Sequence, residues 1–158
     1  MADADADAER RQRLFRLNQG FVEFVPHNKA LGLRFTGFDV GKARLLLPYD
    51  PKLVGNPETG VLHGGAISAL LDACCGAAVF IKVGGTGSVA TLDLRIDYLR
   101  PATPNQDVTC VAECFKATRN VAFVRALAYD GDEDDPVAAA AGSFMIFETT
   151  ARSAGEKP

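Results

Sequence analysis

Several residue types that direct attention to a particular class of protein are scarce in this chain. Its 158 residues include no tryptophan, two histidines and four cysteines. Cys74 and Cys75 are adjacent, Cys110 and Cys114 would lie roughly 13 Å apart on one strand, and no Cys-x-x-Cys pair occurs. We therefore expect neither a disulfide framework nor a zinc site, and a reducing cytoplasm is the simplest setting for such free thiols.

A basic excess and a leader segment are also missing. The net charge is -3 at pH 7, so nothing neutralises the phosphates of a nucleic acid or of an anionic membrane, and we expect neither partner. Residues Met1–Glu9 are acidic and lack an apolar core, so we expect no signal peptide. Asp72 interrupts the longest apolar run, and we expect no membrane span.

The chain does have enough apolar sequence for one compact domain. Its hydrophobic content is 47% and its charged content 23%, which is typical of a folded core. We expect an acidic, disordered segment over residues 1–8, a single domain over residues 9–149, and a flexible tail over residues 150–158.

A long apolar helix is expected over residues 64–81, and it organises the rest of the chain. Between Gly64 and Ile81 the only polar side chains are Ser68 and Asp72, and their spacing of four places them on one helical face. A helix that is apolar all round is normally buried, and a buried carboxylate is costly unless it is paired, hydrogen-bonded or facing a polar cavity. Asp72 is therefore the first candidate for a functional side chain.

The remaining elements follow from periodicity and turn residues. Apolar residues at spacings of three and four predict an amphipathic helix that starts at Glu9 and ends near Pro26. A long loop is expected over residues 49–62. Strands are expected over residues 31–40, 43–48, 90–98, 108–117, 121–129 and 136–148. Short turns between strands favour an antiparallel sheet, so the fold class is α+β, with the sheet wrapped around one long central helix.

Strict alternation in the strand over residues 90–98 predicts two different faces. The apolar face comprises Ala90, Leu92, Leu94, Ile96 and Tyr98, and the polar face comprises Thr91, Asp93, Arg95 and Asp97. Thr91 would reach the apolar helix only if a twist or bulge turned it over.

Two motifs carry a family resemblance. His63-Gly64-Gly65 is followed by Asp72 nine residues after the histidine, and the later strand reads Asp93-Leu-Arg-Ile-Asp-Tyr-Leu-Arg-Pro-Ala. Over roughly residues 31–147 the chain resembles hotdog-fold acyl-CoA thioesterases of the phenylacetate-degradation (PaaI-like) type. The resemblance implies a hotdog fold and hydrolysis of a small-to-medium or aryl acyl-CoA. It also implies that neither a metal nor an organic cofactor is needed.

The resemblance also implies roles for individual residues. Asp72 matches the general base or nucleophile, and Gly64 matches the residue whose backbone N–H polarises the thioester carbonyl. His63 matches the histidine that helps to build the site. Asn56 resembles a polar loop residue that orients water, and Thr91 matches a Ser/Thr that assists the water.

The spacing of the two main candidates implies more than one subunit. Gly64 and Asp72 are eight residues apart on one helix, which is roughly 12 Å and too far to serve one carbonyl. If both act, they come from different subunits, so we expect a homodimer with two shared sites. The fold family commonly stacks two such dimers, so a homotetramer is also open.

Contacts with the substrate are expected at several further positions. Gly65 and Ser68 adjoin the candidate site, and Arg100, Lys116 and Arg119 are candidates for the CoA phosphates. The depth of the acyl pocket would depend on apolar side chains, for which the candidates are Phe21, Phe24, Phe80 and Val54.

Structural interpretations stand beside these functional ones. Asp72 could be held by the backbone or Ser68, His63 could cap the helix, and Asn56 could be a turn residue before a proline. Lys116 and Arg119 could be solvated hairpin charges. The alternative function is a non-catalytic acyl-CoA sensor or binding module. A hotdog dehydratase ranks last, because its histidine five residues after the aspartate is replaced here by Ala77.

Overall fold

The structure is a computed structural model that describes residues 2–85 and 87–147, with side chains described from residue 8 onward. Its helical elements are α1 (Ala2–Leu17), the π-helical turn η1 (Asn18–Glu23), α2 (Pro26–Ala30), the 3-10 turn η2 (Pro51–Leu53) and α3 (Gly64–Lys82). Its strands are β1 (Arg34–Asp39), β2 (Lys42–Leu47), β3 (Val54–Asn56), β4 (Val61–Leu62), β5 (Ser88–Tyr98), β6 (Val108–Ala117), β7 (Val121–Tyr129) and β8 (Ala138–Phe147).

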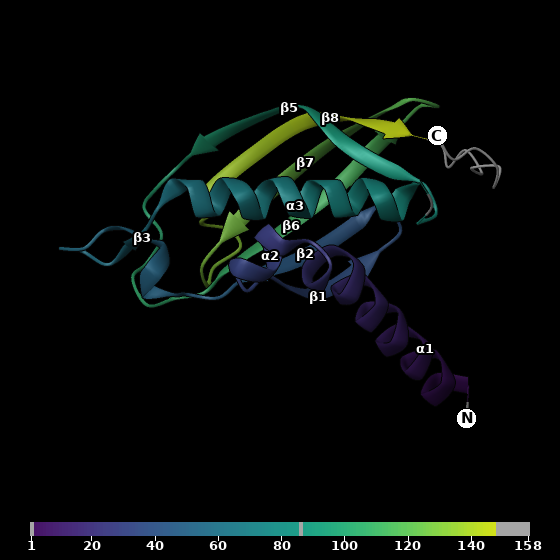
Figure 1. The fold of residues 1–158 in the computed structure, drawn as a ribbon, viewed down its shortest axis with the longest axis horizontal. Helices are drawn as coiled ribbons and strands as arrows, with labels where there is room; N and C mark the ends of the chain where they lie inside the picture. Colours follow the sequence, from purple (N-terminus) through teal and green to yellow (C-terminus); the bar gives the residue numbers. More distant parts are fainter. Residues whose placement is uncertain (1, 86, 148–158) are drawn as a thin grey trace, which may run out of the picture.

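Six of these strands form one antiparallel sheet, in the order β1-β2-β6-β7-β8-β5. The sheet curves around α3, which runs across it as a single long helix (Figure 1). The short pair β3-β4 forms a separate hairpin that projects beyond the N-terminal end of α3 (Figure 1). The predicted α+β arrangement, an antiparallel sheet around one long helix, is confirmed.

The apolar composition of α3 is explained by its burial. Leu70, Leu71, Cys74 and Cys75 have no exposed surface, and they pack against inward-facing residues of β2, β6 and β7. By length and composition α3 could cross a membrane, but 61% of its most apolar window is already buried within the protein. Complete burial of each leucine stabilises the fold by roughly 1.5–3 kcal/mol, so this helix is the main anchor of the core.

All four cysteines are free and buried. The Cys74 thiol lies 3.4 Å from the Ala43 carbonyl oxygen and 3.5 Å from the Cys110 carbonyl oxygen. Burial raises the pKa of the Cys75 thiol, and the neighbouring Cys74 and Asp72 raise it further. These thiols are therefore core residues rather than nucleophiles.

The N-terminal segment differs from the expectation in two ways. The chain is helical from Ala2, where we expected disorder through residue 8; alanine is the best helix former, and acidic residues near a helix start favour its dipole. The expected helix over residues 9–26 is present as far as Glu23, but its geometry changes from α-helical to π-helical after Leu17. Asn18 lies at this change: its Oδ1 accepts the Phe35 N–H at 2.8 Å and ties the segment to β1. The expected flexible tail over residues 150–158 lies outside the described residues.

The alternation predicted for β5 is wrong at its centre, because the strand contains a β-bulge. Thr91 pairs with Phe144 of β8 and Asp93 pairs with Ser143, which leaves Leu92 as the extra residue. Leu92 is 54% exposed, whereas Val89 before the bulge and Leu94 after it pack on the core. The inward face therefore changes from odd to even residues at this point, because a bulge inserts one residue into a period of two.

Candidate active site

The first turn of α3 is capped by the side chain of His63. Its Nδ1 accepts the Gly65 N–H at 2.9 Å, and its carbonyl oxygen accepts the Ala66 N–H at 3.0 Å. The capping interpretation of His63 is thus confirmed. Among the described residues the Gly64 N–H has no acceptor. It is the free donor at the positive end of the helix dipole, where an oxyanion is favoured.

Two hydroxyl groups contact the carbonyl oxygen of Gly64. The Tyr98 hydroxyl lies 2.8 Å from the Gly64 carbonyl oxygen, the Ser68 hydroxyl lies 3.1 Å from it, and the two hydroxyls are 2.6 Å apart. A Cβ at Gly64 would lie 3.4 Å from the Tyr98 ring, so a side chain there would press on the tyrosine. Ser68 therefore positions the helix start rather than holding Asp72.

Tyr98 is a site residue that the sequence argument missed. The alternation of β5 did place it on the inward face, and its hydroxyl is a group that normally finds a partner when it lies against a helix. Only the register between β5 and α3 shows that this partner is Gly64.

Asp72 and Thr91 form the second half of the site. The Thr91 hydroxyl donates to Asp72 Oδ1 at 2.7 Å. The bulge at Leu92 makes this contact possible, since it turns Thr91 toward α3. Gly142 of β8 permits the bulge: a Cβ there would lie 2.3 Å from the Asp93 carbonyl oxygen.

The expected burial of Asp72 is wrong within a single chain. Asp72 is exposed, because β5 is an edge strand and the face of α3 beyond it is uncovered. Among the described residues Asp72 Oδ2 accepts no hydrogen bond, so one carboxylate oxygen is oriented by Thr91 and the other remains open. This arrangement suits a base that must take a proton from water.

Asn56 does not meet these residues within the chain. Its Oδ1 accepts the Glu58 N–H at 3.0 Å, and its carbonyl oxygen accepts the Thr59 and Gly60 N–H groups at 3.2 and 2.9 Å. The interpretation of Asn56 as a turn residue in the β3-β4 hairpin is therefore confirmed. A role in orienting water stays a prediction.

The Arg100 guanidinium forms ion pairs with two aspartates of the same chain. Its Nη2 donates to Asp130 Oδ1 at 2.5 Å and its Nε lies 3.0 Å from Asp135 Oδ2. Burial raises the pKa of the Asp130 carboxyl, but hydrogen bonds from Arg100 and the Thr103 N–H outweigh it, so the pKa lies below the ordinary 3.8. Two aspartates thus hold the Arg100 guanidinium, and its contact with the CoA phosphates stays a prediction.

The other two cations lie at the exposed β6-β7 hairpin. Lys116 is near the end of β6 and Arg119 is in the turn that follows. Neither is brought to Asp72 by the fold of one chain, and their contact with CoA stays a prediction. Within the described residues no three His, Cys, Asp or Glu side chains gather to hold a metal ion.

Comparison with known proteins assigns the family. The model of the thioesterase superfamily matches residues 59–137, a segment that contains His63, Gly64, Asp72, Thr91 and Tyr98. The chain belongs to the thioesterase superfamily. The prediction of a hotdog-fold enzyme that hydrolyses thioesters is thereby confirmed.

Individual relatives of this thioesterase agree with the assignment. The medium/long-chain acyl-CoA thioesterase YigI of Salmonella typhimurium is 30% identical over 151 residues, covering 85% of this chain and 94% of the relative. A Pseudomonas aeruginosa protein of known structure is 42% identical, with a TM-score of 0.77, and the match covers 85% of this chain and 98% of the other. The PaaI protein of Escherichia coli has the same fold. It is 18% identical, with a TM-score of 0.74, and the match covers 86% of this chain and 94% of the other.

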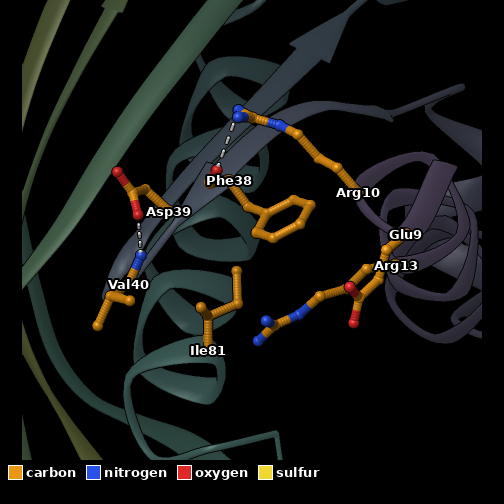
Figure 2. A pocket seen from close by; sticks show the side chains of 7 residues that line it. All are labelled: Glu9, Arg10, Arg13, Phe38, Asp39, Val40 and Ile81. Carbon is orange, nitrogen blue, oxygen red and sulfur yellow. Dashed lines mark hydrogen bonds between the residues drawn. The ribbon is translucent and has the colours of Figure 1, made fainter. Parts of the chain in front are cut away.

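Three cavities of this thioesterase include residues of α3 in their lining. One of about 350 Å³ adjoins the capped helix start and is lined by His63, Gly65, Val54 and Lys52, among others. A larger one of about 620 Å³ lies at the other end of α3 and is lined by Phe21, Phe24 and Phe80. The third, of about 360 Å³, separates α1 from β1 and Ile81 (Figure 2). Three of the four predicted acyl-pocket residues thus share one cavity, and Val54 lies in another.

Proposed function

We propose that the protein hydrolyses acyl-CoA thioesters, with Asp72 as the general base. The observation that carries the proposal is the exposed Asp72 carboxylate, held at 2.7 Å by Thr91 on one oxygen and open on the other. The activity named for YigI, the acyl-CoA thioesterase relative, supports the choice of substrate.

The reaction follows from these groups. Asp72 Oδ2 takes a proton from a water molecule as the water oxygen bonds to the thioester carbonyl carbon. The carbonyl oxygen becomes negative and accepts the Gly64 N–H, which lies at the positive end of α3. When the tetrahedral intermediate collapses, the carbon–sulfur bond breaks and the proton passes from Asp72 to the CoA thiolate.

A homodimer is part of the proposal. Gly64 and Asp72 of one chain are separated by eight residues of helix, roughly 12 Å, so one carbonyl reaches both only if they come from two chains. β5 is an unpaired edge of 11 residues in the described sheet, with Leu92 and Tyr98 exposed on it. Antiparallel pairing of two β5 strands about a two-fold axis would cover these residues and set the two α3 helices antiparallel. Stacking of two dimers into a tetramer remains a further expectation.

The substrate and setting are also proposals. The medium/long-chain relatives favour a longer acyl chain than the small-to-medium or aryl group expected from the sequence. Lys116 and Arg119 are proposed to contact the CoA phosphates, because they are exposed cations on one hairpin. A reducing cytoplasm suits the four free thiols.

The test is release of free CoA thiol from short, medium, long and aryl acyl-CoAs. Asp72→Ala should lower kcat/KM by a hundredfold or more with folding intact. Asp134→Ala, which removes an exposed turn carboxylate, is the matched control and should equal wild type. Binding of every acyl-CoA without turnover would replace the proposal with the sensor function. A single turnover in H₂¹⁸O should label the free acid alone, whereas label in Asp72 would show direct attack by the carboxylate.

A further inference from the structure

The largest of the three cavities lies between the N-terminal segment and the C-terminal end of α3. Its volume is about 620 Å³, within the range of small-molecule sites. Most of its lining is apolar or glycine, and it includes Gly20, Phe21, Phe24, Phe80 and Val89.

Two elements, α3 and β5, run from the Asp72–Thr91 pair to the cavity. Phe80 lies eight residues after Asp72 on the same face of α3, roughly 12 Å along the helix. Position 76 between them on that face is a glycine, and a Cβ there would lie 3.5 Å from the Phe144 ring and 3.9 Å from Val89, so these two side chains fill the space beside it. On β5, Val89 lies two residues before Thr91 on the same side, roughly 7 Å away, and it lines the cavity. An apolar group attached to a carbonyl at Asp72 would therefore reach the cavity by passing over Val89.

The walls of the cavity are rigid on one side and open on the other. The Phe21 ring packs edge-to-face on Phe80, with centroids 5.1 Å apart, and on Phe35, with centroids 6.0 Å apart. Phe24 at the mouth is 83% exposed, which leaves a large apolar surface uncovered. A Cβ at Gly20 would meet nothing within 4 Å, so the space beside it is empty.

Two arginines, Arg13 and Arg16, are among the lining residues, and the charge of Arg13 is directed away from the cavity. Arg13 extends from α1 toward Ile81, and its guanidinium lies 5.1 Å from the centroid of the Phe38 ring, on the side of the neighbouring cavity (Figure 2). Its charge is therefore directed at the Phe38 ring rather than at the phenylalanines that line the cavity.

We propose that this cavity holds the distal part of the substrate's acyl chain, and that Gly20, Phe21 and Phe24 set the chain length accepted. The proposal rests on the proposed thioesterase function and specifies its substrate. An apolar chain fits because the lining offers few hydrogen-bonding side chains and much uncovered aromatic surface. Each methylene that enters should raise kcat/KM by about fourfold until the cavity is full.

The test fills the cavity at Gly20. Gly20→Leu adds a side chain to empty space and replaces a poor helix former, so the fold should persist. Rates with butanoyl-, octanoyl-, dodecanoyl- and hexadecanoyl-CoA should show kcat/KM unchanged within twofold for butanoyl-CoA and lowered at least tenfold for dodecanoyl-CoA. An equal effect on all chain lengths, or none on any, would overturn the proposal.

Two exposed phenylalanines, one inside and one outside the cavity, provide a second test of the proposal. Phe24→Ala should lower kcat/KM for dodecanoyl-CoA at least fourfold, whereas Phe15→Ala, from an exposed α1 residue outside the cavity, should leave it unchanged. Equal effects of the two variants would count against the site. Sedimentation of each variant is compared with wild type, because loss of the oligomer in Gly20→Leu would show that the cavity is a subunit contact and overturn the proposal.

Binding separates this inference from the proposed function. If wild type hydrolyses no acyl-CoA, the thioesterase proposal fails, and calorimetry with dodecanoyl-CoA then decides about the cavity. Binding that Gly20→Leu weakens at least tenfold, with butanoyl-CoA unaffected, would support the chain site. Equal binding of dodecanoyl-CoA by the two proteins would overturn it.

Discussion

The hydrogen bond between Thr91 and Asp72 makes a quantitative prediction for Thr91→Val. Valine keeps the β-branched shape that suits β5 and removes only the hydroxyl that donates to Asp72 Oδ1 at 2.7 Å. A hydrogen bond to a charged group contributes roughly 1.5–3 kcal/mol. Loss of that amount in the transition state lowers kcat/KM by about 10- to 150-fold, since 1.36 kcal/mol corresponds to a factor of ten.

The assay is steady-state thiol release with the best acyl-CoA of the panel. Because Thr91 orients Asp72 and does not hold the substrate, the loss should fall on kcat while KM stays within about twofold. Thr91→Ser restores the hydroxyl and should recover most of the rate. Thr36→Val is the control, because it removes a strand hydroxyl from β1, whose contact is the Arg44 carbonyl at 3.4 Å.

Three outcomes would refute the reasoning about Thr91. Full activity of Thr91→Val with an unchanged melting temperature would show that Asp72 needs no orienting hydroxyl. Failure of Thr91→Ser to recover the rate would show that the hydroxyl alone does not account for the role of Thr91. A loss confined to KM would place Thr91 in substrate binding.

Three further perturbations test other parts of the structure. Gly142→Ala must displace the backbone at the bulge, because its Cβ would lie 2.3 Å from the Asp93 carbonyl oxygen. We expect a loss of ~1–3 kcal/mol in unfolding free energy and a fall in kcat at least as large as for Thr91→Val. An unchanged denaturation midpoint with normal kcat would contradict this expectation. Asp130→Asn breaks a buried ion pair and should cost roughly 3 kcal/mol at pH 7. Since the pKa of Asp130 is lowered in the fold, its contribution to stability is present above pH 3.8 and is lost as the pH falls below that value. The stability of wild type, measured by urea unfolding, should therefore fall more steeply in that range than the stability of Asp130→Asn. Parallel curves would argue against the ion pair. Arg119→Ala should raise KM for acyl-CoA more than it lowers kcat, whereas the reverse pattern in steady-state rates would remove Arg119 from CoA binding.

Much of the fold could be predicted because its signals are local. The apolar run from Gly64 to Ile81 forms a helix with a buried face wherever the sheet lies. Alternation marked the six strands of the large sheet to within a few residues, whereas the short strands β3 and β4 lie in the segment 49–62 that was expected to be a loop. The predicted pairing of His63-Gly64-Gly65 with Asp72 on one helix also needed no tertiary information. Their 12 Å separation, roughly, follows from helical rise alone, and it led to the expectation of two subunits.

The N-terminal segment shows where local signals mislead. The periodicity of Leu14, Leu17 and Phe21 predicts one continuous α-helix, yet the helix becomes π-helical at Asn18, whose side chain binds the backbone of β1. That partner is 17 residues away in the sequence, and no pattern around Asn18 announces it. A side-chain contact with a distant strand thus accompanies the change from α-helical to π-helical geometry, and the local pattern predicts only that the segment is helical.

What the sequence by itself determined is the order of elements, the buried central helix and the two ends of the candidate site, because each depends on periodicity within one segment. Only the tertiary structure decided how those ends are completed. The bulge at Leu92 turns Thr91 to Asp72, Tyr98 reaches Gly64, and Arg100 is taken up by Asp130. Each of these contacts joins residues at least 19 apart in the chain, so it depends on strand register and edge position, which no local pattern encodes.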